Sequence, residues 1–297
     1  MLSLYRVFGL TVASELTLTG LPAGSGAPDI TVRLGTVPSH LPNPRGRGVL
    51  FEALPGAYLL RVDDTARFLA RDGCEVTVAP SASADPRRLQ TLLLGAVFTA
   101  LLHQRGSLVL HASGLAGPNG AVLVAGHSGA GKSTIAAELA SRGYEVIGDD
   151  AAVIVVGDGD ELMVQPGLPQ LNLWKDAATH LGLDDATAQV ALPEIDKYIV
   201  SQPFAFVRGP HRLAAICVIE LGTGDEVVSE ELADSERFSV LKEQTRQFRV
   251  MNALGTNSSH FQLASRVAAQ VPIVRIVRPL RHEARQQVGD IVAALLG

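Results

Sequence analysis

The chain lacks several features that would place it in a class at once. Only two of its 297 residues are cysteine, Cys74 and Cys217, and their spacing matches neither a disulfide framework nor a zinc site. The net charge is −5, with no basic block, so nucleic acid is not an expected partner. The longest apolar run, residues 89–102, is too short to cross a bilayer and is predicted to be a buried helix. We therefore expect a globular, cytoplasmic protein with no membrane partner.

The chain changes character near residue 85. Residues 1–85 contain short alternating apolar runs separated by turn residues, which predicts strands. The opening stretch MLSLYRVFGLTVASEL has an arginine inside its apolar run and is predicted to be a strand rather than a signal peptide. Ser-Ala-Asp-Pro, ending at Pro86, begins a long helix that Gly106 ends. We predict a β-rich N-terminal region over 1–85, a candidate for substrate binding, and an α/β domain over 86–297.

The second part alternates strands and helices. Two apolar strands flank a Gly-Pro-Asn-Gly turn at 117–120, and a helix, the strand YEVIG and a second hairpin follow. Residues 165–212 are predicted to be irregular, and RLAAICVIEL to be a buried strand. The stretches SERFSVLKEQTRQFRVMNAL and SHFQLASRVAAQ are predicted to be helical, and the strand PIVRIVRPL and a helix close the chain.

The hairpin leads into a glycine-rich loop with the pattern G-x-x-x-x-G-K-[ST]. An apolar strand before it and a helix after it are the context in which such a loop cradles phosphates with its backbone N–H groups. Lys132 is expected to reach the β- and γ-phosphates, and Ser133 to offer a hydroxyl to Mg²⁺. The loop therefore predicts ATP and Mg²⁺ as ligands. Its candidate nucleotide-binding residues are Gly126, Ser128, Gly129, Ala130, Gly131, Lys132, Ser133 and Thr134.

Two adjacent aspartates, Asp149 and Asp150, follow Lys132 by only 17 and 18 residues, at the end of a short strand. One carboxylate there can hold Mg²⁺ while the other accepts a proton from an attacking hydroxyl. The chain has no N/T-K-x-D motif of small GTPases and no L-S-G-G-Q signature of transporter ATPases. The short spacing predicts that the neighbouring strand of the same β-α-β unit carries both carboxylates.

From about Ala82 to Gly297 the chain resembles the HPr serine kinase family, and more distantly the ATP-dependent phosphoenolpyruvate carboxykinases. It is most similar to the HPr-kinase-like proteins found beside lasso-peptide and other modified-peptide genes. The resemblance is carried by LHQRG, LHAS, GHSGAGKST and the Asp-Asp pair, all within residues 102–154. It implies a P-loop kinase core of the HPr kinase/phosphoenolpyruvate carboxykinase type, and assembly into oligomers.

The resemblance also implies roles for single residues. His111 matches the active-site histidine, Asp149 the general base, and Asp150 the magnesium partner. Lys197 matches a lysine that the kinase-like proteins carry after their irregular middle. Arg208 and Arg212 stand near the second signature of the family and are candidates for phosphate or substrate contacts.

Two departures bear on the substrate. Thr134 stands where HPr kinases usually have glutamate, and their Gly-Arg-Asn-type signature for binding HPr is not recognisable. The sequence therefore predicts an ATP-dependent serine kinase acting on a peptide, with the C-terminal serine of a lasso-peptide precursor as the implied acceptor. The alternatives are an HPr kinase/phosphorylase that regulates carbohydrate use, a nucleotide-binding sensor without chemistry, and a small-molecule kinase.

Overall fold

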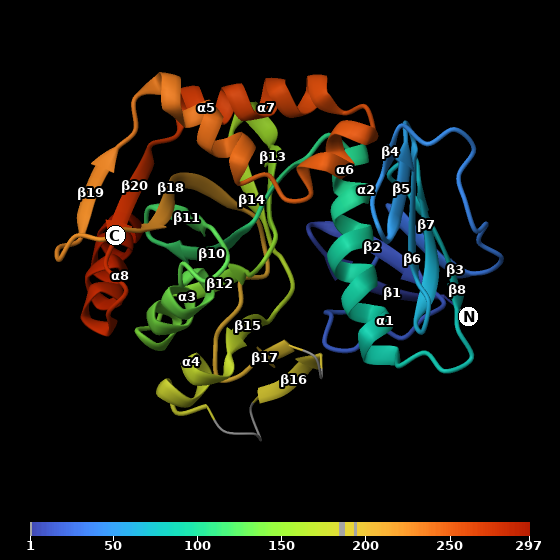
Figure 1. Cartoon of the computed structure of the whole chain (residues 1–297), viewed down its shortest axis with the longest axis horizontal. Helices are drawn as coiled ribbons and strands as arrows, with labels where there is room; N and C mark the ends of the chain where they lie inside the picture. The colour runs from blue at the N-terminus through green and yellow to red at the C-terminus, as the bar shows by residue number, and fades with distance from the viewer. Residues whose placement is uncertain (1, 184–187, 193–194) are drawn as a thin grey trace. The chain divides into compact units, whose positions relative to one another are not determined.

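The computed structural model describes residues 2–183, 188–192 and 195–297, and the chain forms two compact units (Figure 1). The first unit holds the residues up to Val109 together with Arg246–Leu263. The second holds Leu110–Thr245 together with Ala264–Gly297. The first unit thus extends past the boundary predicted at residue 85, because the helix that begins there packs on the N-terminal strands.

The first unit is built on a sheet of eight strands in the order β1-β2-β3-β8-β7-β6-β5-β4. The predicted short strands are confirmed. The opening stretch forms a hairpin rather than one strand, since Phe8 and Gly9 turn the chain with φ angles of 52° and 75°. The strands are β1 (Ser3–Val7), β2 (Leu10–Ser14), β3 (Ile30–Leu34), β4 (Gly46–Arg47), β5 (Phe51–Leu54), β6 (Ala57–Val62), β7 (Ala66–Arg71) and β8 (Glu75–Pro80).

The long helix of the first unit consists of α1 (Pro86–Leu92), the π-helical segment η1 (Leu93–Val97) and α2 (Phe98–Gln104). Asp85 caps it by accepting a hydrogen bond from the Arg87 N–H at 3.0 Å. Phe98 is fully buried, with its ring 6.3 Å from that of Phe8, so the predicted buried helix is confirmed. No helix in the described part of the chain combines the length and apolarity that crossing a membrane would need.

The second unit contains a mixed sheet whose strands run in the order β12-β10-β11-β18-β14-β13, with β20 and then β19 beside the later part of β18. β11, β18 and β20 are parallel, so their carboxyl ends meet at one edge. The strands are β10 (Ala112–Gly117), β11 (Gly120–Gly126), β12 (Glu145–Gly148), β13 (Ala152–Val156), β14 (Leu162–Gln165), β18 (His211–Leu221), β19 (Val228–Glu231) and β20 (Ile273–Arg278); β9 (Leu108–Leu110) spans the point in the chain where the first unit gives way to the second.

One prediction about this sheet is wrong. β12, which precedes the two aspartates, does not neighbour β11, because the antiparallel strand β10 lies between them. β10 occupies that edge of β11 as its hairpin partner, so β12 pairs with the far side of β10. The aspartates therefore approach the glycine loop across β10 rather than from an adjacent parallel strand.

Helices α3 (Lys132–Ser141) and α8 (His282–Leu296) pack on this sheet (Figure 1). Ile135 and Leu139 of α3 and Val288 of α8 are fully buried, in a cluster that includes Cys217 of β18. Burial raises the pKa of the Cys217 thiol to about 12, so this cysteine serves as a small apolar side chain. The predicted helix after the glycine loop and the predicted closing helix are confirmed.

The stretch from 165 to 212 is not irregular as predicted. It contains a separate three-stranded sheet in the order β15-β17-β16, and a short helix. These elements are β15 (Leu171–Trp174), α4 (Lys175–His180), β16 (Ala188–Leu192) and β17 (Ile195–Val200). The sequence did not predict these elements because they are short. β15 has only two buried positions, Leu171 and Leu173, which are too few to establish a hydrophobic period.

The helical stretch near residue 245 is interrupted. α5 (Asp234–Glu243) and α6 (Phe248–Ala253) are separated at Gln247, whose φ of 52° is incompatible with a continuous helix. The predicted helix that follows is confirmed as α7 (Asn257–Gln270).

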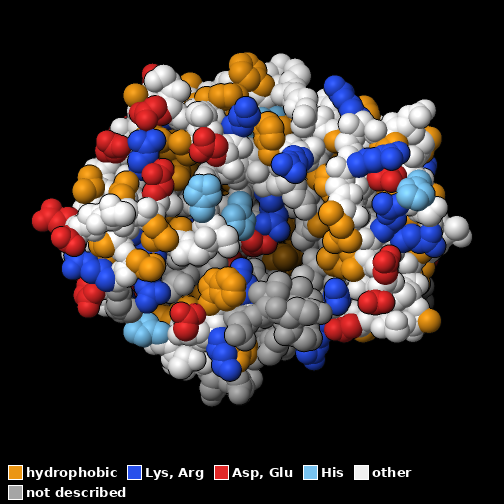
Figure 2. Space-filling view, in the orientation of Figure 1, with side chains coloured by type: hydrophobic (Ala, Val, Ile, Leu, Met, Phe, Trp, Pro, Cys, Tyr) orange, Lys and Arg blue, Asp and Glu red, His pale blue; other side chains and the backbone are white. Residues whose placement is uncertain are grey.

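Acidic and basic side chains are intermixed over the region of β19 and β20, at the left of Figure 2. Arg275 of β20 forms ion pairs with Glu220 at 3.3 Å, Glu230 at 3.0 Å and Glu236 at 3.3 Å. The hydrogen bond to Glu230 is the main cause of the raised pKa of Arg275. Each of these charges is thus compensated by a neighbour.

Candidate active site

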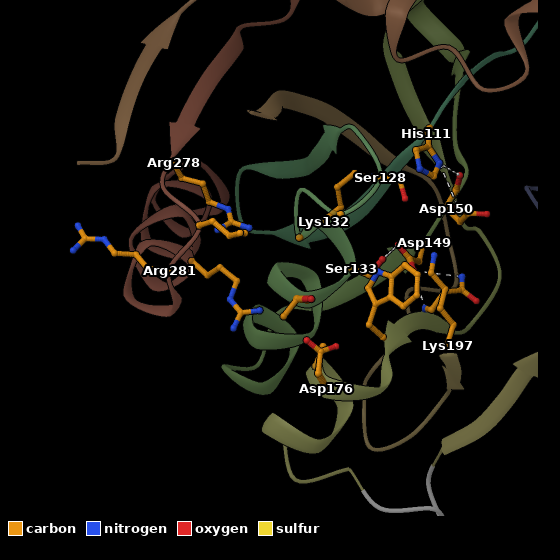
Figure 3. Close-up of a pocket in the computed structure, with 18 residues that line it drawn as sticks. His111, Ser128, Lys132, Ser133, Asp149, Asp150, Asp176, Lys197, Arg278 and Arg281 are labelled. Carbon is orange, nitrogen blue, oxygen red and sulfur yellow. Dashed lines mark hydrogen bonds and ion pairs between the residues drawn. The ribbon is translucent and has the colours of Figure 1, made fainter. Parts of the chain in front are cut away.

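A pocket of about 290 Å³ opens at the edge of the sheet where β11 and β20 end. His111, Asp149 and Asp150 lie at one end and Arg278 and Arg281 at the other, and Lys132, Ser133 and Asp176 lie between them (Figure 3). The lining residues that the sequence singled out are His111, Ser128, Gly129, Gly131, Lys132, Ser133, Thr134, Asp149, Asp150 and Lys197. Residues brought from across the sequence therefore meet in one cavity.

The glycine loop between β11 and α3 has a backbone that only glycine adopts easily. Gly126, Gly129 and Gly131 have φ angles of 142°, 85° and 101°. A Cβ on Gly126 would also lie 2.5 Å from the carbonyl oxygen of Ile219 on the adjacent strand. Gln244 fixes the start of the loop, since its Oε1 accepts a hydrogen bond from the Gly126 N–H at 3.0 Å. Gly126 and Ala130 shape the loop without lining the pocket.

Lys132 begins α3 and is 7 % exposed. Its ammonium group donates hydrogen bonds to the carbonyl oxygens of Gly126 at 2.9 Å and His127 at 3.2 Å. The side chain thus folds back over the loop and holds a positive charge at the mouth of the turn. The first N–H groups of a helix lack intrahelical acceptors, so the loop and the lysine together favour an anion here.

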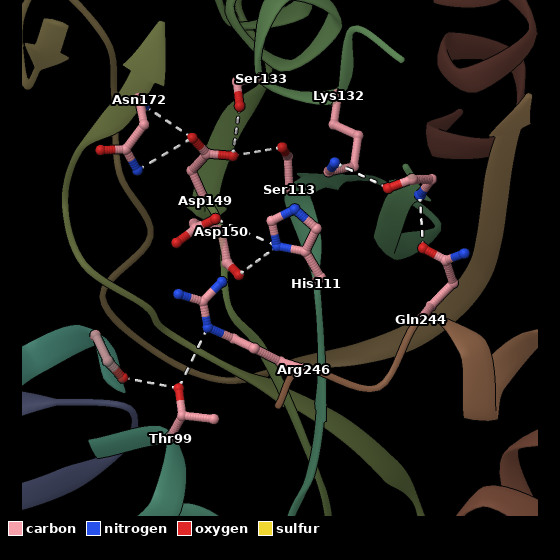
Figure 4. Close-up of polar contacts among 12 residues, drawn as sticks. Thr99, His111, Ser113, Lys132, Ser133, Asp149, Asp150, Asn172, Gln244 and Arg246 are labelled. Atoms are coloured by element: carbon pink, nitrogen blue, oxygen red, sulfur yellow. Dashed lines mark hydrogen bonds and ion pairs between the residues drawn. The ribbon is translucent and has the colours of Figure 1, made fainter. Parts of the chain in front are cut away.

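Asp149 follows β12 and is 5 % exposed (Figure 4). Its Oδ1 accepts hydrogen bonds from the hydroxyls of Ser113 at 2.5 Å and Ser133 at 3.0 Å. Its Oδ2 accepts from the backbone N–H of Asn172 at 2.7 Å. The Asn172 side-chain amide also donates to Oδ2, at 3.4 Å, so donors from β10, α3 and β15 fix this carboxylate beside the loop.

Asp150 is turned toward a different partner. Its φ of 69° is left-handed, and its side chain is 40 % exposed. His111 Nδ1 lies 3.2 Å from both Oδ1 and the carbonyl oxygen of Asp150. Both of these atoms are acceptors, so the Nδ1 position carries the proton. His111 stands at the break between β9 and β10, where one continuous strand had been predicted.

The backbone beside the aspartates is closely packed. A Cβ on Gly148 would lie 2.9 Å from the Cα of Gly167. The Gly167 N–H donates to the Ile147 carbonyl oxygen at 2.7 Å, which joins the two segments. The end of β12 and the segment that leads to β15 are therefore in direct backbone contact.

Lys197 of β17 lies on the acidic side of the pocket, with its ammonium 4.9 Å from the centre of the Trp174 ring. Arg208 and Arg212 are not in this pocket. Arg212 lies near the start of β18, whereas the glycine loop pairs with the region of Ile219. Seven residues of strand separate Arg212 from that end, about 23 Å at a strand rise of about 3.3 Å per residue.

Sequence reasoning missed several residues of the site. Ser113 follows His111 in the LHAS motif, whose serine received no role. Arg278 ends the predicted strand PIVRIVRPL, and a charged residue at the carboxyl end of an apolar strand was the available signal. The other residues without such a signal are Asn172, Trp174, Asp176, Gln244, Arg281 and Arg285.

The residues that could hold a metal ion are few. No group of three or more His, Cys, Asp or Glu side chains suited to a metal occurs among the described residues. A Mg²⁺ site needs fewer protein ligands than three, because Mg²⁺ is commonly bound through one or two carboxylates, with phosphate oxygens and water completing the octahedron. Ser133 and Asp149 supply oxygen atoms of this kind beside the loop, and they fit Mg²⁺ only in company with phosphate.

Comparisons with known proteins give little support of their own. No family model matches the chain, and no curated protein matches it. Among solved structures, it is similar to the Hpr(Ser) kinase/phosphatase from Coxiella burnetii, at 14% sequence identity, covering 63% of this chain and 94% of that chain. The TM-score of 0.32 is too low to carry an argument about fold or activity.

Proposed function

We propose that this protein is an ATP-dependent kinase that transfers the γ-phosphate to a serine hydroxyl of a peptide. The observation that carries the proposal is the contact of Ser133 with Asp149 at 3.0 Å, in the same pocket as the pair of His111 and Asp150. Binding of a nucleotide alone would require the loop and one carboxylate. A second, more exposed carboxylate with its own histidine supports chemistry on a hydroxyl group.

We assign the two aspartates in the opposite order from the sequence expectation. Asp149 accepts hydrogen bonds from three residues, one of which is Ser133, and this suits it to the metal side. Asp150 faces the pocket with more of its side chain exposed, which suits it to proton transfer. His111 orients Asp150 through its Nδ1–H and adds no negative charge to the acidic end.

The steps at the protein's own groups follow from this assignment. Lys132 and the loop N–H groups hold the phosphate chain, and the Ser133 hydroxyl donates a hydrogen bond to Asp149 while its oxygen faces the phosphates. Asp150 accepts the proton of the serine hydroxyl as its oxygen bonds to the γ-phosphorus. The bond from that phosphorus to the bridging oxygen breaks, and ADP leaves. Mg²⁺, when bound, neutralises charge on the phosphate oxygens. Positioning and charge neutralisation provide most of the acceleration.

The acceptor class rests on the resemblance of residues 102–154 to HPr-kinase-like proteins. It points to a peptide, with the C-terminal serine of a lasso-peptide precursor as the specific candidate. Trp174 and Lys197 line the pocket beside the acidic end, where an acceptor would enter.

The test is phosphate transfer from γ-labelled ATP with Mg²⁺ to a synthetic precursor peptide ending in serine, with HPr in a parallel reaction. Mass spectrometry locates the added phosphate, and Asp150→Asn is the matched control. Label on the peptide alone, lost in the variant, is the expected result. Label on HPr alone would replace the peptide with HPr, and ATP binding without transfer to either would refute the peptide assignment.

A further inference from the structure

Three arginines line the pocket, and Figure 3 shows two of them, Arg278 and Arg281, at the end opposite Asp149 and Asp150. Arg278 is the last residue of β20 and is 3 % exposed, Arg281 precedes α8, and Arg285 lies within α8. None of the three was singled out by the sequence. Their gathering in a cavity that also contains the glycine loop raises the question of what compensates their charge.

The contrast with Arg275 on the same strand is informative. Arg275 forms ion pairs with three glutamates. In the described part of the chain, neither Arg278 nor Arg281 nor Arg285 has a carboxylate within ion-pair distance. Burial lowers the pKa of Arg278, the charge of Arg285 lowers it further, and Glu138 opposes both. Like charges that repel one another in a cavity are stabilised when an anion binds between them.

The guanidinium N–H groups of Arg278 already donate hydrogen bonds to the backbone. Its Nη2 and Nε donate to the carbonyl oxygen of Ala130 at 2.8 Å and 3.2 Å, and its Nη1 donates to Pro279 at 3.1 Å. These bonds turn the Ala130 carbonyl oxygen toward the guanidinium and brace the glycine loop from outside. Arg278 is therefore a positioning residue for the loop.

Arg281 and Arg285 remain available to a ligand. Arg281 donates one hydrogen bond to the carbonyl oxygen of Asp225, which leaves further N–H groups of its fork. For Arg285 the described residues provide no hydrogen bond. A Cβ placed on Gly131 would lie 3.9 Å from the Arg285 side chain, so this arginine reaches the turn of the loop itself.

The direction of a bound nucleotide follows from the two ends of the pocket. Asp149 and Asp150 mark the end where the γ-phosphate would react. A triphosphate that reaches that end from the loop extends its other end past Thr134 toward the arginines. The exposed side chain of Leu280 lies there as well and offers an apolar surface to a base.

We propose that Arg281 and Arg285 form a subsite for the α-phosphate and ribose of a nucleoside triphosphate, with Arg278 positioning the loop between them and Lys132. This inference rests on the proposed function, because that function places the γ-phosphate at the aspartate end of the pocket. The subsite binds the α-phosphate, a group that ATP and ADP share. It therefore acts on both nucleotides and not on the transferred phosphate.

The test measures dissociation constants for Mg-ATP and Mg-ADP by calorimetry. The variants are Arg281→Ala, Arg285→Ala and Arg285→Lys, and Arg212→Ala is the matched control, because Arg212 lies outside the pocket. We expect each alanine variant to weaken ATP and ADP by about the same factor, on the order of tenfold for a lost charge-assisted contact. Arg285→Lys should recover part of the loss, and Arg212→Ala should match the wild type.

The outcomes separate the subsite from the proposed function. Unchanged binding of both nucleotides by the alanine variants, with the wild type binding normally, would overturn the subsite alone. Weakened ATP with unchanged ADP would place the arginines at the γ-phosphate and overturn the assignment. A wild type that binds neither nucleotide would remove the proposed function as well. Thermal melting of each variant shows whether it is folded.

Discussion

The two compact units bury polar side chains in different ways. In the second unit the buried Lys132, Asp149 and Arg278 lie around a single pocket. In the first unit the buried Glu52 and His103 have separate partners: Glu52 is bonded by His40 at 2.8 Å and by the Leu41 N–H at 2.7 Å, and His103 Nε2 by the Arg246 carbonyl oxygen at 2.8 Å. Burying a polar group costs free energy unless it is bonded. In the first unit the buried polar groups lie apart from one another, each with its own partner. In the second unit the buried charged groups lie together around one pocket, as they do at a functional site.

Among the substitutions that test this contrast between the units, one at Asp149 is expected to lower activity the most. Asp149→Asn removes the charge beside Ser133 and leaves donors facing an amide. We expect Mg²⁺-dependent transfer to fall by about 10³-fold or more, the scale of losing one charge-stabilising group in phosphoryl transfer. Initial rates against Mg²⁺ concentration measure it. Full activity in this variant would mean that the buried network is structural.

Asp150→Asn is expected to give the next largest loss. Removal of a general base lowers a rate by about 10² to 10⁴-fold. ATP affinity should stay close to that of the wild type, because Asp150 does not touch the glycine loop in the proposed mechanism. Single-turnover rates and nucleotide binding, measured on the same preparation, separate the two quantities. A variant that loses ATP binding but keeps its turnover would reverse the assignment of the two aspartates.

In the first unit the expected effect is on stability. Burial lowers the pKa of His103 to about 4, although its Nε2–H donates to the Arg246 carbonyl oxygen at 2.8 Å. The unfolded chain binds this proton near pH 6.5, so it holds more protons than the folded state between pH 6.5 and 4. The free energy of unfolding should therefore decrease as the pH is lowered from 6.5 to 4, by at most about 1.4 kcal/mol per pH unit.

Urea unfolding followed by circular dichroism from pH 7 to pH 4.5 measures this slope. His103→Gln serves as the control, because it cannot titrate. Trp174, the one tryptophan of the chain, lies in the second unit and reports on it by fluorescence. Equal slopes for the wild type and His103→Gln would show that other groups cause the dependence.

The smallest effect is expected for Glu52→Gln. The change weakens the bonds to His40 and Leu41, and the loss of a charged acceptor costs about 1 to 3 kcal/mol of unfolding free energy. Nucleotide binding should be unchanged, because the pocket belongs wholly to the second unit. Weaker ATP binding in a folded Glu52→Gln protein would break the contrast between the two units.

The parts of the site that are local in sequence could be predicted. The glycine loop, its flanking strand and helix, and the nearby Asp-Asp pair depend on spacing within about thirty residues, where turn and helix chemistry acts. Arg278 could not be found in this way, because it meets Ala130 across 148 positions through the pairing of β18 with β20. Strand order posed the same difficulty. Nothing in the spacing of Lys132 and Asp149 shows that β10 lies between β11, which leads to the glycine loop, and β12, which leads to Asp149.

The hydrogen bond from Asn172 to Asp149 has a mechanical consequence. β15 belongs to the small sheet that carries Trp174 and Lys197, yet its backbone is fastened to the carboxylate that also holds Ser133. Gly148 and Gly167 pack closely behind that carboxylate, with no room for a side chain between them. Under the proposed function, a shift of β15 would act on Asp149 through this hydrogen bond, and the affinities for peptide and for Mg²⁺ are expected to be linked, each changing the other by the same factor.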